Sequence, residues 1–268
     1  MIHSSALIDP QAHLGANVKV GPYVIIEAGA EIGEGCEIQA HAIIGGHVRM
    51  GEGNLVGYGA IVGGDPQDYA FQSSVQSEVR IGNRNRIREY CTIHRGSKDG
   101  GFTKVGDECF LMGGVHLAHD VKLGNNVVIA NNSLLAGYVQ VDDGVFIGGG
   151  CVFHQHIRVG RLAICQGLSG YGKDLPPYTM GAEVNGVAGL NVIGLRRAGF
   201  SAADRAEIKE AFTLLYRRGL NVSQAIEHSK QQIWNEKSQV FWSFIADAKK
   251  RGICDLIRNR GTSEHETP

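Results

Sequence analysis

The sequence predicts a parallel β-helix of hexapeptide repeats over residues 1–190, followed by a small α-helical domain over residues 191–260. An aliphatic residue recurs every six positions through most of the first 165 residues, and glycine is abundant at 38 residues while aromatic residues make up only 7%. After about residue 200 the apolar spacing changes to the three or four positions typical of helices. The final residues, 261–268, are expected to form a flexible tail.

The repeat consists of aliphatic side chains, each usually followed by glycine or another small residue. Its first members are Ile8, Leu14, Val20, Ile26, Ile32, Ile38, Ile44, Met50, Val56 and Val62, and it resumes at Ile81, Ile87 and Ile93 and from Val105 to Cys165. A period of six fits neither the 3.6 of an α-helix nor the alternation of a strand. It fits a triangular coil of about 18 residues, in which each hexapeptide supplies a short strand and a corner, and the coils stack about 4.8 Å apart.

Two segments interrupt the repeat and are interpreted as loop insertions. Residues 65–78 shift the register by one residue, whereas residues 97–104 replace one repeat and keep the register. Long excursions from a regular scaffold often carry function, so both loops are expected near a site. The alternative is that they are tolerated surface insertions.

Three helices are expected in the second domain. Ser201 and Asp204 fit an N-cap and its capping box, and the first helix should stop near Gly219. Its apolar stripe contains Ile208, Phe212, Leu215 and Tyr216. Two further helical patterns cover residues 222–233 and 238–251.

Composition narrows the function classes. The net charge is −1, which argues against a nucleic-acid-binding protein, and no run of about 18 apolar residues would insert stably in a membrane. The first residues lack the basic and apolar regions of a signal peptide, so a cytoplasmic location is expected. Cys36, Cys91, Cys109 and Cys151 each follow a repeat aliphatic by four positions, where Ala and Val also recur, and are predicted to be small core residues rather than metal ligands.

The 18-residue coil predicts one column of polar residues. His119, Gly137 and Gln155 are 18 positions apart and should stack on one edge, as should Asp120 and Tyr138 beside them. His116 and His154 lie near this column. A titratable cluster on adjacent coils is what general-base chemistry needs, so the column is a candidate active site.

Several segments resemble the UDP-N-acetylglucosamine O-acyltransferases that begin lipid A synthesis. They are NRNRIREYCTIHRG (83–96), TKVGDECFLMGGVHLAHD (103–120), ANNSLLAG (130–137), FHQ (153–155), DLPPY (174–178) and GLNVIGLRRAGFS (189–201). The resemblance implies a left-handed β-helix and a homotrimer with sites between subunits. It also implies transfer of a 3-hydroxyacyl group from acyl carrier protein to the sugar 3-hydroxyl. No cofactor is expected, because the phosphopantetheine thioester of acyl carrier protein is already activated.

The resemblance also assigns roles to residues. His119 would be the general base, Asp120 would orient it, and the Gly137 N–H would stabilise the oxyanion. Residues implied in contacts with the nucleotide sugar, the carrier or the acyl chain are Asp68, His116, Tyr138, His154, Gln155, Gly167, Asn191 and Arg197. Arg196, Arg197, Arg205, Lys209, Arg217 and Arg218 could form a basic dock for the acidic carrier protein, or simply a solvated helix surface.

The chain departs from the family pattern mainly where the acceptor binds. Ala70, Tyr138, Ile193 and Ala198 replace residues that are usually Lys, His, acidic and Arg, and SSVQS (73–77) replaces a Gly-Glu-Pro-Thr segment. We therefore expect acyl transfer to be retained in a changed acceptor pocket, in an enzyme of this pathway or in a paralogue that acts on another nucleotide sugar.

Two other function classes stay open. A γ-carbonic-anhydrase-like zinc enzyme could use His116, His119 and either His154 or His156, but the H-x-x-x-x-H spacing of that family is absent. A silent scaffold is the other, and the His119–Gly137 pair argues against it.

Overall fold

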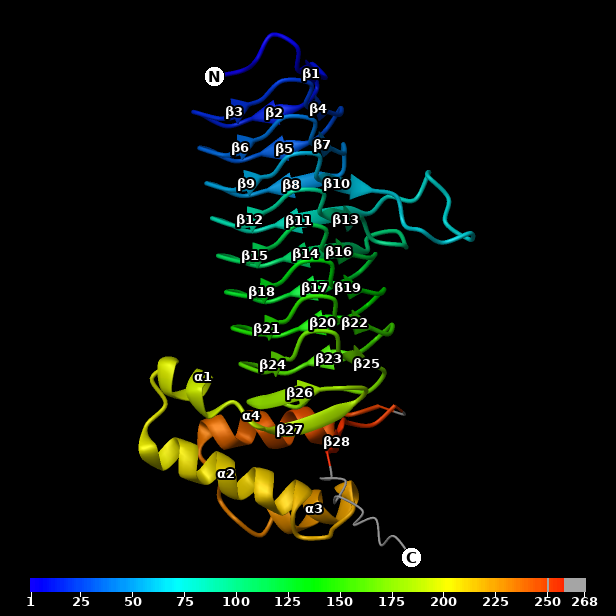
Figure 1. Cartoon of the computed structure of the whole chain (residues 1–268). Coiled ribbons are helices and arrows are strands. Elements are labelled where there is room, and N and C mark those ends of the chain that lie inside the picture. Colours follow the sequence, from blue (N-terminus) through cyan, green and yellow to red (C-terminus); the bar gives the residue numbers. More distant parts are fainter. Residues whose placement is uncertain (250, 258–268) are drawn as a thin grey trace, which may run out of the picture.

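The computed structural model describes residues 1–249 and 251–257, so the expected tail at 261–268 and the last residues of the predicted helical domain lie outside the described residues. The chain forms a left-handed parallel β-helix with a small helical domain at its C-terminal end (Figure 1). From β1 to β25, successive strands lie on three sheets in turn, and strands on the same sheet pair in parallel. At the end of the stack, β26 and β27 lie on one sheet and pair antiparallel.

The three sheets have nine, eight and eleven strands among the described residues. The first sheet contains β1 (Leu7–Ile8), β4 (Ile25–Ile26), β7 (Ile43–Ile44), β10 (Ile61–Gly64), β13 (Thr92–His94), β16 (His116–Leu117), β19 (Leu134–Leu135), β22 (Val152–Phe153) and β25 (Gly170–Tyr171). The second contains β2 (His13–Leu14), β5 (Glu31–Ile32), β8 (Val48–Met50), β11 (Glu78–Ile81), β14 (Phe102–Val105), β17 (Lys122–Leu123), β20 (Gln140–Val141) and β23 (Arg158–Val159). The third contains β3 (Lys19–Val20), β6 (Glu37–Ile38), β9 (Leu55–Val56), β12 (Arg86–Ile87), β15 (Phe110–Leu111), β18 (Val128–Ile129), β21 (Phe146–Ile147), β24 (Ile164–Cys165), β26 (Thr179–Ala182), β27 (Gly186–Leu190) and β28 (Asp255–Leu256).

The core is a column of inward side chains, as the repeat predicts. In the regular coils, residues 18 positions apart pair between strands, for example Leu117 with Leu135, and both are fully buried. The four predicted core cysteines are buried and free, and their thiols donate to carbonyl oxygens. Burial raises the pKa of Cys91 and of Cys109 to about 11, so these groups stay neutral thiols. The interpretation of these cysteines as core residues is confirmed.

Both loop insertions leave the same corner of the prism, between a first-sheet strand and the next second-sheet strand. Ile81 pairs with Met50, 31 positions earlier, and Val105 pairs with Ile81, 24 positions earlier, so each loop lengthens a coil without skipping a face. The prediction that residues 97–104 replace a repeat is therefore wrong: the extra residues form a loop, and β14 begins at Phe102 on the expected next face. The larger loop projects from the stack after β10 (Figure 1).

The two loops are bound to each other and to the prism. The Gln76 N–H donates to Asp99 Oδ1 at 2.7 Å, and the Gly100 N–H donates to the Gln76 carbonyl at 2.8 Å. Arg95, which is 2% exposed, pairs with Asp65 and donates to the Ser73 carbonyl at 2.9 Å. The two loops thus form one hydrogen-bonded unit at this corner of the prism.

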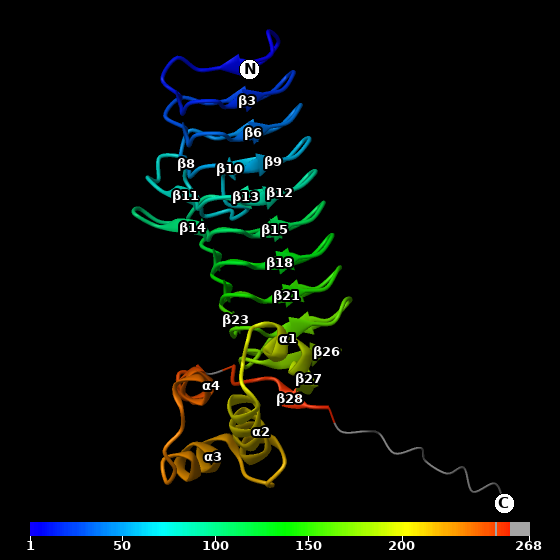
Figure 2. The same ribbon diagram turned by 90° about the vertical axis from the view of Figure 1, so that its left-hand side faces the viewer.

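The helical domain packs under the last coils (Figure 2) and contains α1 (Val192–Arg197), α2 (Ala202–Tyr216), α3 (Val222–Ser229) and α4 (Glu236–Ala246). The Ser201–Asp204 capping box of α2 is present as predicted. Helices α3 and α4 are shorter than predicted, and α1 was not predicted. Asn235 caps the start of α4 by accepting the Ser238 N–H, and the indole N–H of Trp234 donates to the Ser229 carbonyl at the end of α3.

The helical domain is fastened to the prism by direct contacts. Strand β28 pairs with β27, the Arg158 guanidinium donates to the Phe244 carbonyl, and the Tyr178 hydroxyl donates to the Lys237 carbonyl. Among the described residues, no helix has the length and apolar character needed to cross a membrane.

The inward and outward positions of one strand give a direct stability test. Ile38→Ala should lower the free energy of unfolding by about 2–5 kcal/mol, because Ile38 is 1% exposed in the core column. Glu37→Ala is the matched control on the same strand: its side chain points outward and pairs loosely with Lys19, so we expect a loss below about 1 kcal/mol. Urea unfolding measures both, and equal losses would contradict the orientation of β6.

Candidate active site

His119 lies two residues after β16, at the corner of the prism from which both loops emerge. Its side chain is 13% exposed and that of Asp120 10%. Asp120 has a φ of 61°, the left-handed conformation that this corner also imposes on Tyr138 and His156 in the next two coils. The backbone therefore has the same conformation at this corner in successive coils, and residues at equivalent positions point in the same direction.

The predicted column of His119, Gly137 and Gln155 is present. The Tyr138 N–H donates to the His119 carbonyl and the His156 N–H donates to the Gly137 carbonyl, both at 3.1 Å. The imidazole of His119 lies across Gly137. A Cβ at Gly137 would be 2.5 Å from His119 Cε1 and 2.6 Å from Nε2, so only glycine leaves room for the ring. No hydrogen bond from the Gly137 N–H to an acceptor is present within the described part of the chain.

Asp120 fixes the other nitrogen of the imidazole. Its Oδ2 lies 3.0 Å from His119 Nδ1 and also accepts from the Ser97 N–H at 3.0 Å and the Ser97 hydroxyl at 2.7 Å. The Asp120 N–H donates to the buried hydroxyl of Thr103 at 2.8 Å. Because a carboxylate oxygen only accepts, the proton of the neutral imidazole lies on Nδ1, and in this tautomer Nε2, the nitrogen beside Gly137, presents its lone pair.

Tyr138 completes this arrangement from the next coil. Its hydroxyl lies 2.8 Å from Ser97 Oγ, and its ring meets His119 edge-on at 5.2 Å and stacks on His156 at 4.6 Å. Ser97 carried no sequence signal of function. Its approach to Asp120 depends on the path of the loop, which the repeat does not determine.

Two further histidines adjoin this site. His116 faces outward on β16 and its Nδ1 lies 2.7 Å from the Thr92 hydroxyl. His94 meets His116 at a ring separation of 5.0 Å, is 7% exposed, and has a buried Nδ1 without a hydrogen-bond partner in the described chain. Burial, reinforced by the nearby His116 and His119, lowers the pKa of His94 to about 4, and burial also lowers the pKa of His116. Sequence reasoning missed His94, although it lies in the TIHRG block.

The other predicted site residues are spread along the prism. Asp68 is exposed in the large loop and accepts the Ala70 N–H at 2.9 Å, whereas His154 and Gln155 are exposed one coil beyond Gly137. Gly167 lies at an exposed corner, where a Cβ would be 3.1 Å from the Gly149 carbonyl oxygen.

The predicted contacts in and near α1 lie apart from His119. Asn191 caps α1 by accepting the Gly194 N–H and donates to the Leu162 carbonyl, so both ends of its amide are engaged. Arg197 is exposed on α1, which lies at the end of the stack, while β16 lies near its middle (Figure 1). The structure therefore does not bring Asn191, Arg197 or Gly167 to His119 within one chain.

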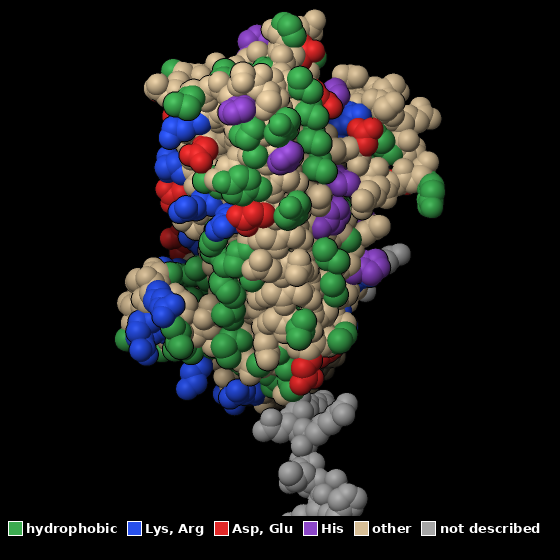
Figure 3. All heavy atoms as spheres, turned by 45° about the horizontal axis from the view of Figure 1, so that its top comes forward, with side chains coloured by type: hydrophobic (Ala, Val, Ile, Leu, Met, Phe, Trp, Pro, Cys, Tyr) green, Lys and Arg blue, Asp and Glu red, His purple; other side chains and the backbone are tan. Residues whose placement is uncertain are grey.

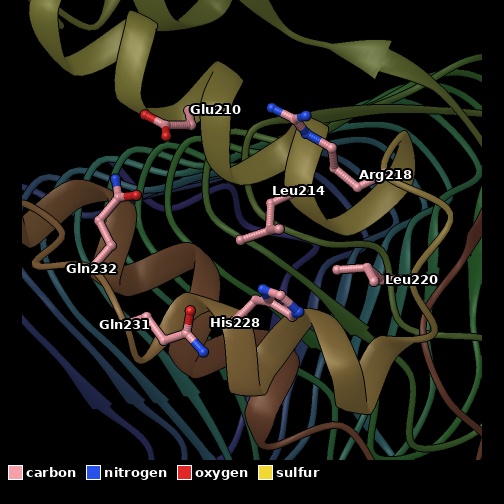
Figure 4. A pocket seen from close by; sticks show the side chains of 7 residues that line it. All are labelled: Glu210, Leu214, Arg218, Leu220, His228, Gln231 and Gln232. Atoms are coloured by element: carbon pink, nitrogen blue, oxygen red, sulfur yellow. The ribbon is translucent and has the colours of Figure 1, made fainter.

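Lys and Arg side chains gather on the helical lobe (Figure 3). Of the predicted basic dock, Arg205 is half-buried and donates to the Phe200 carbonyl, and the others are exposed: Arg196, Arg197, Lys209, Arg217 and Arg218. The Arg217 guanidinium also lies over the Phe212 ring. A cavity between α2 and α3 lies within this domain and shares no residue with the His119 site (Figure 4). It is lined by Glu210, Leu214, Arg218, Leu220, His228, Gln231 and Gln232.

In residues 1–249 and 251–257, no three His, Cys, Asp or Glu side chains converge in a way that could hold a metal ion. Within one chain, His116 lies against Thr92 and His94, and His119 lies against Asp120.

Family models match both parts of the chain. Residues 174–254 match the second domain of the family described as UDP-N-acetylglucosamine O-acyltransferase, and residues 1–33 and 102–137 match bacterial transferase hexapeptide repeats. The chain is 40% identical over 255 residues to the acyl-(acyl-carrier-protein)–UDP-N-acetylglucosamine O-acyltransferase of Thermodesulfovibrio yellowstonii, covering 94% of this chain and 98% of that protein. It is also 40% identical over 260 residues to the protein of the same name from Halorhodospira halophila, covering 96% of each.

Solved structures give the same result. The UDP-N-acetylglucosamine acyltransferase of Francisella novicida superposes with a TM-score of 0.91 at 35% identity, over 97% of this chain and 95% of that one. The enzyme of the same name from Campylobacter jejuni superposes with a TM-score of 0.90 at 34% identity, over 96% of this chain and all of that one.

Because the pKa of His94 falls from about 6.5 in an unfolded chain to about 4 in the fold, only the unfolded chain binds this proton between those values. The free energy of unfolding should therefore be unaffected by protonation of His94 above pH 6.5. It should fall by on the order of 3 kcal/mol as the pH is lowered from 6.5 toward 4, because protonation favours the unfolded chain. His94→Phe, which keeps the ring but cannot protonate, should flatten this part of the pH dependence in urea unfolding. His13→Asn, at an exposed position, should not; an unchanged slope in His94→Phe would show that His94 does not cause it.

Proposed function

The chain belongs to the acyl-(acyl-carrier-protein)–UDP-N-acetylglucosamine O-acyltransferase family, and from this premise we propose that His119 is the general base of its acyl transfer. The enzyme transfers an acyl group from acyl carrier protein to UDP-N-acetylglucosamine, the first reaction of lipid A biosynthesis. The observation that carries the role of His119 is its position: Nδ1 is bound to Asp120, and Nε2 lies against Gly137 on the adjacent coil.

The reaction follows from that placement. The sugar 3-hydroxyl is a weak nucleophile, so Nε2 removes its proton while the oxygen attacks the thioester carbonyl carbon. The C–S bond then breaks, and the protonated imidazole returns the proton to the phosphopantetheine sulfur. Asp120 keeps Nδ1 protonated and stabilises the imidazolium that forms between the two steps.

Gly137 serves this step twice. The absence of a Cβ makes room for the His119 ring, and its N–H, which no acceptor in the described residues engages, can donate to the oxyanion of the tetrahedral intermediate. Base and oxyanion donor then lie on adjacent coils and are held in register by the backbone ladder. No cofactor is needed in this scheme, because the thioester already activates the acyl group.

The nucleotide sugar is proposed to bind between the large loop and the His119 column. Asp68 in that loop, and His154 and Gln155 beyond Gly137, offer exposed polar groups on the same side of the prism. The replacement of the usual Lys by Ala70 removes a charge from this loop, whereas Tyr138 is directed to Ser97. The replacement at Ala70 adjusts the acceptor pocket and leaves His119, Asp120 and Gly137 unaltered.

A homotrimer with sites between subunits is proposed from the outer face of the first sheet. This face carries an exposed column of aliphatic side chains, interrupted by Thr92 and His116 at the site. Its exposed members are Leu7, Ile25, Ile61, Leu134 and Val152. A second subunit that covers this face would bury the apolar column and close the site, and could bring its own Asn191 and Arg197 to the nucleotide.

The exposed arginines and lysine of α1, of α2 and of the turn after α2 are proposed to dock acyl carrier protein, which is acidic, by charge complementarity (Figure 3). A cytoplasmic site of action is also proposed: the six cysteines are free and buried, which suits a reducing compartment.

The decisive experiment is an acyl-transfer assay with purified protein, UDP-N-acetylglucosamine and 3-hydroxyacyl carrier-protein thioesters of several chain lengths. The parent should form the 3-O-acylated nucleotide sugar. His119→Ala should lose at least about 100-fold in kcat while its circular dichroism, melting temperature and elution volume stay those of the parent. An unchanged rate in His119→Ala would remove the proposed base.

Gly137→Ala tests the space beneath the imidazole. The added methyl group would displace the His119 ring while keeping the backbone N–H, so we expect kcat to fall about 100-fold with the fold intact. Gly172→Ala is the matched control, because a Cβ there would meet its nearest neighbour, Asn185 Oδ1, at an ordinary 3.6 Å. Full activity in Gly137→Ala would mean that the ring does not need its observed place.

A further inference from the structure

We propose that Ser97 and Tyr138 are positioning residues for the general base: a chain of hydrogen bonds from Tyr138 through Ser97 to Asp120 fixes the carboxylate that orients His119. This inference rests on the function proposed above for His119. It gives Tyr138, a departure from the family pattern, a role in the catalytic machinery rather than in acceptor binding.

Ser97 supplies two of the three donors that converge on one oxygen. Asp120 Oδ2 accepts from the Ser97 N–H at 3.0 Å, from the Ser97 hydroxyl at 2.7 Å and from His119 Nδ1 at 3.0 Å. Asp120 is only 8% exposed, so little water competes for this oxygen. Hydrogen bonds in such a shielded setting hold geometry more firmly than they do in water.

The direction of every bond in the chain is determined. A carboxylate oxygen can only accept, so the Ser97 hydroxyl gives its single hydrogen to Asp120. The contact of 2.8 Å between Ser97 Oγ and the Tyr138 hydroxyl must then be a bond donated by Tyr138. The hydrogen bonds therefore run from Tyr138 to Ser97 and from Ser97 to Asp120. His119 Nδ1 donates to the same carboxylate, which leaves Nε2 as the basic nitrogen.

Tyr138 is itself held in place on both sides. Its ring stacks on His156 at 4.6 Å and 9°, and its edge-on contact with His119 is at 5.2 Å. Because its hydroxyl hydrogen is used by Ser97, Tyr138 has no hydrogen left to donate to a substrate.

The two loop insertions bring Ser97 to this place. Ser97 opens the shorter loop, which is bound to the larger one through Asp99 and Gly100. Gly101 lies at the other end of the short loop. A Cβ added there would be only 3.1 Å from Asp120 Oδ1, so the loop backbone lies close against the carboxylate. The extra residues of the irregular coils thereby reach the reacting histidine.

The test combines kinetics with a direct view of the imidazole in the full-length enzyme. Ser97→Ala should lower kcat on the order of 10-fold and leave both KM values within about twofold, because orientation of the base matters in the transition state. Ser97→Thr, which keeps the hydroxyl, should restore kcat. Tyr138→Phe should lower kcat by a smaller factor of about 3, since it acts one bond further away. Lys98→Ala, an exposed neighbour in the same loop, should behave as the parent.

Nitrogen NMR of ¹⁵N-histidine-labelled protein supplies the readout that does not depend on turnover, with the His119 signals assigned from a His119→Gln variant. The parent should show a protonated Nδ1 and an unprotonated Nε2 at neutral pH, and Ser97→Ala should populate the other tautomer. Unchanged His119 signals and kcat in Ser97→Ala would overturn the proposal, as would a change confined to KM. If the parent itself transfers no acyl group, the proposed function fails while the NMR comparison still decides whether Ser97 orients His119.

Discussion

The structure depends on the hydrogen-bond ladder that joins each coil to the next. Where the coil has its regular length, residues 18 positions apart occupy the same place on adjacent coils, as Leu117 and Leu135 do. One short strand has almost no stability of its own, so the ladder and the inward aliphatic column form together. The same register sets His119 across Gly137, and the distance between the proposed base and the proposed oxyanion donor is therefore a property of the ladder rather than of a flexible loop.

A regular ladder also restricts where function can be added. Strands on all three faces must stay paired, so extra residues can be accommodated only at corners. Both insertions lie at the corner of His119 and leave the strand order intact. Buried polar groups then fix the corner: Arg95 holds the large loop, and Thr103, which occupies an inward position where Val79 and Val121 lie on adjacent coils, accepts the Asp120 N–H. Burying a hydroxyl in an otherwise aliphatic column costs free energy, and the hydrogen bond with the Asp120 N–H offsets this cost.

Sequence was sufficient wherever the period of six operates. The faces, the buried cysteines and the His119–Gly137 column all follow from counting, and the Ser201 capping box follows from local chemistry. It was insufficient where the period fails. In the sequence, the loop at 97–104 looks like a replaced repeat, because six extra residues have the length of one hexapeptide, and only the strand pairing distinguishes the two. His94 and Ser97 were missed for a related reason: their contacts are made across loops whose paths are set by tertiary hydrogen bonds. The bounds of α3 and α4 also differ from the apolar patterns. Helix α3 ends at Ser229, whose carbonyl accepts the indole N–H of Trp234, and α4 begins after the Asn235 cap and ends at Ala246, before the end of its predicted range.

The departures of this chain from its family's pattern are of two physical kinds. Ala70, Ile193 and Ala198 are exposed, and each removes a charge without gaining a polar contact that replaces it. Tyr138 is different, because its hydroxyl is part of a hydrogen-bonded chain with Ser97 and its ring is packed between two histidines. An exposed charge that is lost changes affinity alone, whereas a side chain bonded to the partner of the base changes how the base is held. We therefore group the substitution at 138 with the proposed orientation of His119, and the proposed changes in the acceptor pocket with the three exposed positions.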